Sequence, residues 1–373
     1  MHITMNRYGL MKAAMAAERI APFKSPIEAL ECTLLTTEGG ALTVASTNQE
    51  MALELRLQAT IHEEGSMLLS ARWLSKILKG LDGTDVTISQ TAGKKAIISC
   101  GTTRFQIASP DAKEYPRMAI PFPGHTVSVK GIPNTAKRTV FAVGEVEGRP
   151  HMKCVNLVFT KDGLRAFGSD GYRIAVARGS SKGSASTSML LPATSFQRLA
   201  QLVDNRDELQ VGTTGKTVVF SKEDFRFSAR LMDGTYLDAD QLLRNMTKQF
   251  VVLTDAEQMR TAMTSATVVR GQQNRFSLTF SGSTLHLQCE SELGISSMPI
   301  QVTALSGKPD GIFWYNPITL EECLKALDGT LLLEVAQRGV LLMKTDDLIC
   351  MQTAIREPKE IQKPQKKPRK KAA

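Results

Sequence analysis

An amphipathic helix pattern recurs three times along the chain at almost constant spacing. In the segment SARWLSKILKGLDG (70–83), apolar residues stand at positions i, i+3, i+4 and i+7, which form one stripe of a helix. The stripe returns after 122 residues (196 − 74) and again after 124 (320 − 196), each time before a stop signal such as Leu-Asp-Gly. The stripes are Leu74, Ile77, Leu78 and Leu81; Phe196, Leu199, Ala200 and Val203; and Leu320, Cys323, Leu324 and Leu327. Such regular spacing indicates an internal repeat.

Strand-like sequence follows each of these helices in the same order. Short stretches that alternate apolar and polar residues are separated by small polar turns such as TTGK and TDD. This pattern predicts antiparallel meanders. The predicted strands lie at 85–89, 94–100 and 104–109; at 208–212, 217–221 and 225–231; and at 330–335, 339–344 and 348–355.

The repeat predicts the domain organisation. A further helix is expected near the start of each third, at 7–20, 133–145 and 255–267. Each third then holds two helices on antiparallel sheet, so the fold class is α+β with three tandem copies of one unit. The Pro-rich stretch 120–124 and the stretch 244–248 mark the boundaries. We expect domains at 1–123, 124–247 and 248–357, and a tail at 358–373.

Most of the net charge of +9 lies in the C-terminal tail. Residues 358–373 hold seven Lys and Arg and one Glu, so the tail carries +6 (7 − 1) and the rest of the chain only +3 (9 − 6). A segment this polar is expected to be disordered, because it has too little apolar surface to bury. It would serve either as a sequence-blind contact with DNA or RNA or as a solubilising end.

Patterns that would indicate an enzyme, a metalloprotein or a secreted protein are incomplete. The six cysteines stand singly, and His62 before Glu63 and Glu64 lacks the second His of a zinc-binding helix, so we expect no metal or other cofactor. In GTTGKT (212–217), Gln210 stands where a phosphate-binding loop needs Gly, which favours a hairpin turn. Neither a signal-peptide pattern nor a membrane-spanning apolar stretch is found, so a cytoplasmic protein is expected.

Two local motifs resemble a known family. SDGYRIA (169–175) is similar to the Thr-Asp-Gly-His-Arg-Leu-Ala signature in the central domain of the bacterial beta sliding clamp, the beta subunit of DNA polymerase III. FSARLMDGTYLD (227–238) resembles that family's segment ending in Asp-Gly-Arg-Phe-Pro-Asp. Weaker similarities at 104–116 and 141–150 extend the resemblance over residues 5–356.

The resemblance implies a processivity factor without catalytic activity of its own. Such a clamp is a head-to-tail homodimer, a ring with pseudo-sixfold symmetry that encircles double-stranded DNA of any sequence and tethers the replicative polymerase. The clamp loader and other DNA-processing proteins would bind it through short peptides, and no membrane is involved. The alternative is a monomeric nucleic-acid-binding scaffold that keeps the fold without ring closure.

One predicted helix has a basic face. Arg72, Lys76 and Lys79 lie opposite its apolar stripe, as suits a surface that slides over phosphates without contacting base edges. For this helix alone, a solvated face is the alternative. Together with the resemblance, the charge pattern predicts further DNA contacts at Lys24, Lys137, Arg138, Arg149 and Arg198.

The resemblance also implies a partner-peptide cleft between the second and third domains. Aliphatic and Met side chains there would take the Leu and Phe anchors of a peptide, and Tyr172 and Arg173 are expected to hydrogen-bond it. Leu237 replaces a family Pro, and Thr353 replaces a Met, so a specialised second clamp with other partners is an open alternative. The cleft residues are Met152, Ser169, Gly171, Tyr172, Arg173, Ile174, Leu237, Leu242, Met351, Thr353 and Ile355.

Ring closure is expected at an open sheet edge, because unpaired edges must be paired or protected. The strand at 104–109 is the candidate edge in the first third. Its residues Phe105 and Ile107 are expected to meet Val268 and Val269 of a second copy, with Trp73 close by.

Overall fold

The computed structural model describes residues 1–91, 94–116, 120, 121, 123–183 and 187–358. It is an α+β fold that divides into two compact units, each described by itself below. The first unit holds Met1–Asn134, Phe159–Leu164 and Ser180–Asp233, and the second holds Thr135–Val158, Arg165–Gly179 and Gly234–Ala373. The division into three domains stays a prediction, and the tail from 359 onward lies outside the described residues.

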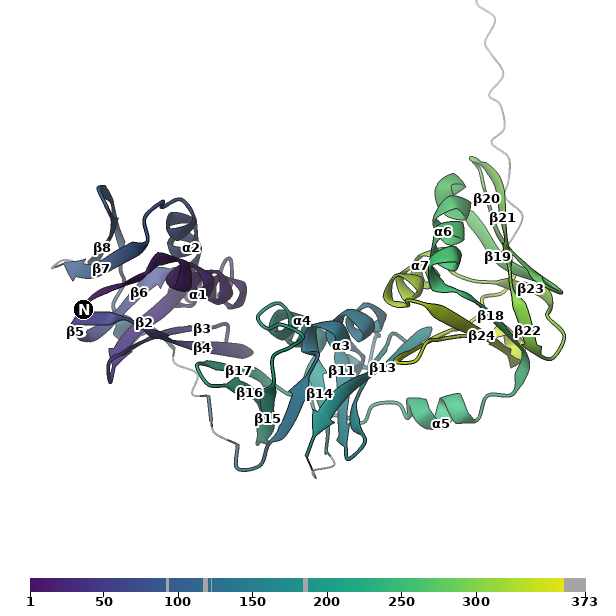
Figure 1. Cartoon of the computed structure of the whole chain (residues 1–373), viewed down its shortest axis with the longest axis horizontal. Helices are drawn as coiled ribbons and strands as arrows, with labels where there is room; N and C mark the ends of the chain where they lie inside the picture. Colours follow the sequence, from purple (N-terminus) through teal and green to yellow (C-terminus); the bar gives the residue numbers. More distant parts are fainter. Residues whose placement is uncertain (92–93, 117–119, 122, 184–186, 359–373) are drawn as a thin grey trace, which may run out of the picture. The chain divides into compact units, whose positions relative to one another are not determined.

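Two helices pack side by side in the N-terminal part of the first unit (Figure 1). Helix α1 (Arg7–Ile20) begins where the Asn6 side chain accepts a hydrogen bond from the Gly9 amide, and α2 (Ala71–Lys79) is capped in the same way by Ser70. Their apolar stripes share one core with a five-stranded antiparallel sheet. Its strands run in the order β5 (Thr60–Glu63), β1 (His2–Asn6), β7 (Asp85–Thr91), β8 (Lys95–Cys100) and β9 (Thr103–Ala108).

A second antiparallel ladder of the first unit joins segments far apart in the sequence. Strand β4 (Met51–Gln58) pairs with β17 (Phe225–Arg230), with Phe227 opposite Leu53. On one side the ladder continues through β3 (Ala41–Thr47), β2 (Cys32–Glu38) and β6 (Gly65–Ser70). On the other side it continues through β16 (Thr217–Lys222), β15 (Leu209–Thr214) and β10 (Val127–Lys130). This unit also holds β14 (Thr187–Pro192) and α4 (Ala193–Ala200).

The second unit contains two sheets around one core. The first sheet joins β22 (Thr303–Ser306), β18 (Lys248–Asp255), β24 (Thr330–Ala336), β25 (Leu341–Lys344), β26 (Leu348–Gln352) and the start of β13 (Arg173–Lys182). The second has the order β21 (Gly294–Gln301), β20 (Thr284–Ser291), β19 (Asn274–Ser281) and β23 (Asp310–Trp314). Helices α6 (Ala256–Ala266) and α7 (Pro317–Ala326) pack against each other beside them (Figure 1).

The remaining elements of the described residues are two helices, two strands and six 3-10 turns. They are the helices α3 (Ile132–Thr139) and α5 (Ala239–Arg244), the strands β11 (Cys154–Thr160) and β12 (Gly163–Ser169), and short 3-10 turns at Glu28–Glu31, Ala112–Glu114, Val140–Ala142, Pro150–Lys153, Thr267–Val269 and Gln337–Gly339. No helix in the described part of the chain is long and apolar enough to cross a membrane.

The predicted helices and strands can be compared with these elements. The three stripe helices are confirmed as α2, α4 and α7, and the meander strands are confirmed as the β7–β9, β15–β17 and β24–β26 hairpins. GTTGKT is a hairpin turn, with Gly215 at φ +57°. The helix predicted at 133–145 is wrong in its second half, because Thr139 leaves the helical conformation (φ −129°) and a single 3-10 turn follows.

Candidate functional site

The turn that carries SDGYR is specified by its own side chains. It joins the end of β12 at Ser169 to the start of β13 at Arg173. The Asp170 carboxylate accepts hydrogen bonds from the backbone amides of Tyr172 (2.9 Å) and Arg173 (3.0 Å). Gly171 sits at φ +89°, a conformation that favours glycine. As a result the Tyr172 side chain is held outward, 71% exposed.

Arg173 lies beneath this turn and ties three segments of the second unit together. Its guanidinium donates to Asp170 (3.0 Å), to the Phe141 carbonyl (2.6 Å) and to Glu322 on α7. Burial alone would lower the pKa of Arg173, but the Glu322 hydrogen bond and the Asp170 charge outweigh it and raise the pKa above the ordinary value. The side chain is only 6% exposed, so its N–H groups donate hydrogen bonds within the protein.

An apolar cluster borders the turn in the second unit. The outward faces of β13, β26 and β25 contribute Ile174, Met351 and Leu342, and the segment before α5 adds Leu237. Leu242 on α5 and Ile355 after β26 are 41% and 42% exposed. The backbone amide of Thr353 donates to the Tyr172 carbonyl (2.9 Å), which fixes the C-terminal segment beside the turn.

The predicted cleft residues therefore fall into two groups. Buried are Met152, Ser169, Arg173, Ile174 and Met351, whereas Leu237 and Thr353 are half-buried and Gly171, Tyr172, Leu242 and Ile355 are exposed. Sequence reasoning missed Leu342 and Val176 in the same cluster. Alternate residues of β25 and β13 face the same side of the sheet, and this two-residue period in the sequence would have predicted both positions.

The predicted DNA contacts are surface side chains with one exception. Arg72, Lys76 and Lys79 are exposed on α2, opposite its buried stripe. Lys24 and Arg198 are exposed in the first unit, and Lys137 and Arg149 are exposed in the second. Arg138 is half-buried and forms an ion pair with Asp347, so its charge is already compensated.

Two family models match successive parts of this chain. Residues 1–119 match the N-terminal domain of the DNA polymerase III beta subunit. Residues 126–238 match the central domain of the same subunit. The chain belongs to the beta sliding clamp family.

Relatives within the family are similar over most of their length. The beta sliding clamp of Streptomyces coelicolor (strain ATCC BAA-471 / A3(2) / M145) is 26% identical over 338 residues, covering 88% of this chain and 89% of that protein. That of Bacillus subtilis (strain 168) is 27% identical over 278 residues, covering 72% and 73%. The solved DNA polymerase sliding clamp from Bacillus subtilis superposes with a TM-score of 0.88 at 21% identity, covering 96% of this chain and all of that one.

The sliding-clamp fold leaves apolar sheet edges open in each unit. In the first unit, β9 is an edge strand, and Trp73, Ile77, Phe105 and Ile107 line a hollow of about 430 Å³ beside it. In the second unit, Val268 and Val269 lie in the 3-10 turn after α6, which contacts edge strand β21. Val268 is 76% exposed, and so is Ile295 on β21, which sequence reasoning missed.

Proposed function

We propose that the chain is a DNA sliding clamp that works as a ring-shaped, head-to-tail homodimer around duplex DNA. The observation that carries the proposal is the match of two successive domains to the beta subunit of DNA polymerase III. A tether of this kind needs no catalytic residue and no cofactor. In a bacterial cell it would act in the cytoplasm, on replicating DNA.

Ring closure would pair edge strand β9 of one copy with β21 of the other. Both edges carry exposed apolar side chains, Phe105 on β9 and Ile295 on β21. Trp73 and Val268 flank these strands and are 58% and 76% exposed. Burying large apolar side chains contributes on the order of 1.5–3 kcal/mol each, so these residues supply a driving force for association.

The DNA contact would be weak and independent of sequence. The exposed Lys and Arg side chains of α2 can approach phosphates, and each phosphate neutralised adds a salt-dependent term. Few such contacts leave the protein free to slide. Retention on DNA would then depend on closure of the ring.

Partner peptides would bind over the apolar cluster beside the SDGYR turn. We assign the exposed side chains of Tyr172, Leu242 and Ile355 to its rim, where they would take the apolar anchors of a peptide. Because the Arg173 guanidinium is engaged internally, we assign it to positioning the turn. The clamp loader, the replicative polymerase and other DNA-processing proteins are the expected carriers of such peptides.

Sedimentation separates this proposal from the monomeric scaffold. A closed ring requires a species of twice 40.8 kDa at micromolar concentration. We expect that dimer to persist when salt is raised, because the edges carry apolar side chains. A folded monomer under all conditions would favour the scaffold.

A further inference from the structure

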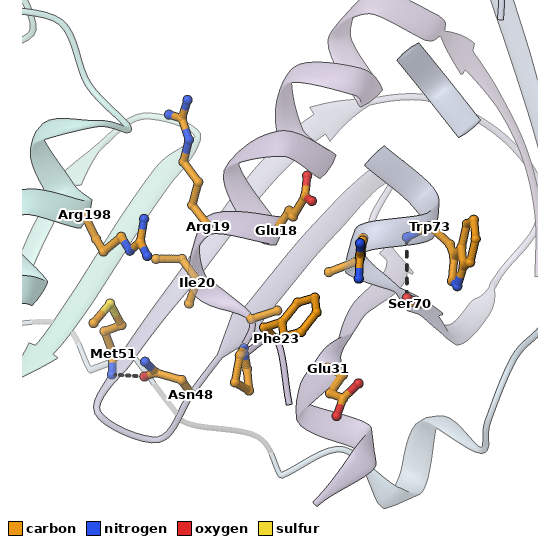
Figure 2. A pocket seen from close by; sticks show the side chains of 14 residues that line it. Glu18, Arg19, Ile20, Phe23, Glu31, Asn48, Met51, Ser70, Trp73 and Arg198 are labelled. Atoms are coloured by element: carbon orange, nitrogen blue, oxygen red, sulfur yellow. Dashed lines mark hydrogen bonds between the residues drawn. The ribbon is translucent and has the colours of Figure 1, made fainter. Parts of the chain in front are cut away.

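A polar hollow of about 520 Å³ opens in the first unit between the end of α1, the start of α2 and the end of α4. Figure 2 shows Phe23 in the middle of it, with Arg198, Asn48 and Met51 on one side and Ser70 and Trp73 on the other. This hollow shares Ser70 and Trp73 with the hollow beside β9, and the two have no other lining residue in common. None of the roles proposed above explains why the Phe23 ring is exposed to solvent in this hollow.

Three guanidinium groups surround the hollow: those of Arg19, Arg72 and Arg198. Gln201 holds two of them, because its backbone carbonyl accepts from Arg19 and its side-chain oxygen accepts from Arg198 (3.2 Å). A guanidinium carries five N–H donors, and these bonds take one from each group. Both groups are thereby pre-positioned with donors left for a phosphate, which arginine recognises well.

Phe23 is the second component of the site. Its ring is 69% exposed, so its face is accessible to a ligand. The Arg72 guanidinium lies 4.8 Å from the ring centroid, so a planar cation contacts a planar aromatic ring at the hollow. Unpaired nucleobases stack on such aromatic rings and guanidinium planes.

The carboxylates at the rim limit which ligand fits. Glu31 accepts the Ser25 amide (2.9 Å) and Glu18 lies 4.0 Å from the Lys79 ammonium, so both are partly compensated. The guanidinium groups outnumber the carboxylates three to two, which leaves the lining with a net charge of +1 (3 − 2). Their combination with an exposed ring favours a nucleotide over an acidic peptide, which would use the charge but not the ring.

We propose that this hollow binds an unpaired nucleotide of single-stranded DNA, with its base on Phe23 and its phosphate between Arg19 and Arg198. The inference deepens the proposed function and rests on DNA as the ligand of the clamp. Such a site would let the clamp bind single-stranded DNA next to the duplex. The duplex itself offers no unstacked base to this site.

Titration of the full chain with short fluorescent oligonucleotides tests the site. The probes are a thymidine oligomer and an abasic oligomer of equal length, with identical phosphates. Wild type should bind the thymidine oligomer more tightly, and Phe23→Ala should weaken that binding about five- to hundred-fold while leaving abasic binding unchanged. Arg198→Ala should weaken both probes and reduce the salt slope by about 0.7.

Tyr8→Ala is the matched control. Tyr8 lies on α1, the helix that precedes Phe23; it is 55% exposed and has the Lys12 ammonium 4.6 Å from its ring, but it is not part of the hollow. This variant should bind like wild type. Equal affinity of wild type for the two probes, or thymidine binding unchanged in Phe23→Ala, would overturn the proposal.

The outcome is separable from that of the clamp function itself. Phe23→Ala leaves both sheet edges intact, so it should still remain on closed circular DNA after loading. Wild type that fails to remain there would instead refute the clamp, whatever the oligonucleotides show.

Discussion

Replacing Arg173 by Met removes the charge that holds the SDGYR turn to α7. The substitution keeps an aliphatic side chain of similar length but leaves Asp170 and Glu322 without their shared cation. Breaking a buried ion pair from one side costs on the order of 3–5 kcal/mol. Glu322 is 42% exposed and can be rehydrated, so we expect the lower end, a loss of about 3 kcal/mol in the free energy of unfolding of the second unit.

Urea denaturation followed by near-UV circular dichroism measures this loss. Lys216→Met is the control, because its ion pair with Asp233 is 75% and 74% exposed and should contribute less than about 1 kcal/mol. Peptide titration adds the functional readout. Arg173→Met should lose affinity together with stability, and Arg173→Lys should recover part of both. Unchanged unfolding of Arg173→Met would refute the positioning role that we assign to this residue.

Three further predictions concern the rim, the edge and a buried carboxylate. Tyr172→Ala and Leu242→Ala should each weaken a generic clamp-binding peptide by about tenfold in fluorescence anisotropy without changing dimerisation, and wild-type affinity in both would place the peptide site elsewhere. A Phe105→Asp, Val268→Asp double variant should sediment as a folded monomer, whereas an intact dimer would exclude these edges. Burial favours a higher pKa for Glu334, but hydrogen bonds from the Lys344 and Lys248 side chains outweigh it and lower the pKa below 4.5. The carboxylate therefore stabilises the fold above pH 4.5, and this contribution is lost as pH falls through the lowered value. Thermal melts of Glu334→Gln should accordingly approach wild type in acid, and a constant difference across pH would contradict this linkage.

Local patterns in the sequence were sufficient for most helices and meanders. The stripe from Leu74 to Leu81 is buried, and the cap at Ser70 and the Leu-Asp-Gly stop both lie within a few residues of it. Where local signals were weaker, the prediction failed. The helix predicted to run to 145 ends at Thr139, before Val140 and Phe141, whose side chains lower helix propensity.

The candidate site was predictable only in part, because its contacts join residues far apart in the sequence. The bond between Arg173 and Asp170 spans three residues and belongs to the turn itself. The hydrogen bond to Glu322 joins residues 149 positions apart, and no local sequence pattern predicts it. For the same reason Arg173 was expected to face a peptide, and the hollow around Phe23 was not foreseen.

Retention on circular DNA tests the central claim most directly. The clamp is loaded onto nicked circular plasmid by a clamp loader and passed through a sizing column in high salt, before and after one cut linearises the plasmid. We predict that it elutes with the nicked circle and is lost from the linear form, because a ring is held by topology and its phosphate contacts are screened by salt. Equal retention on both forms, or loss from both, would contradict a sliding clamp.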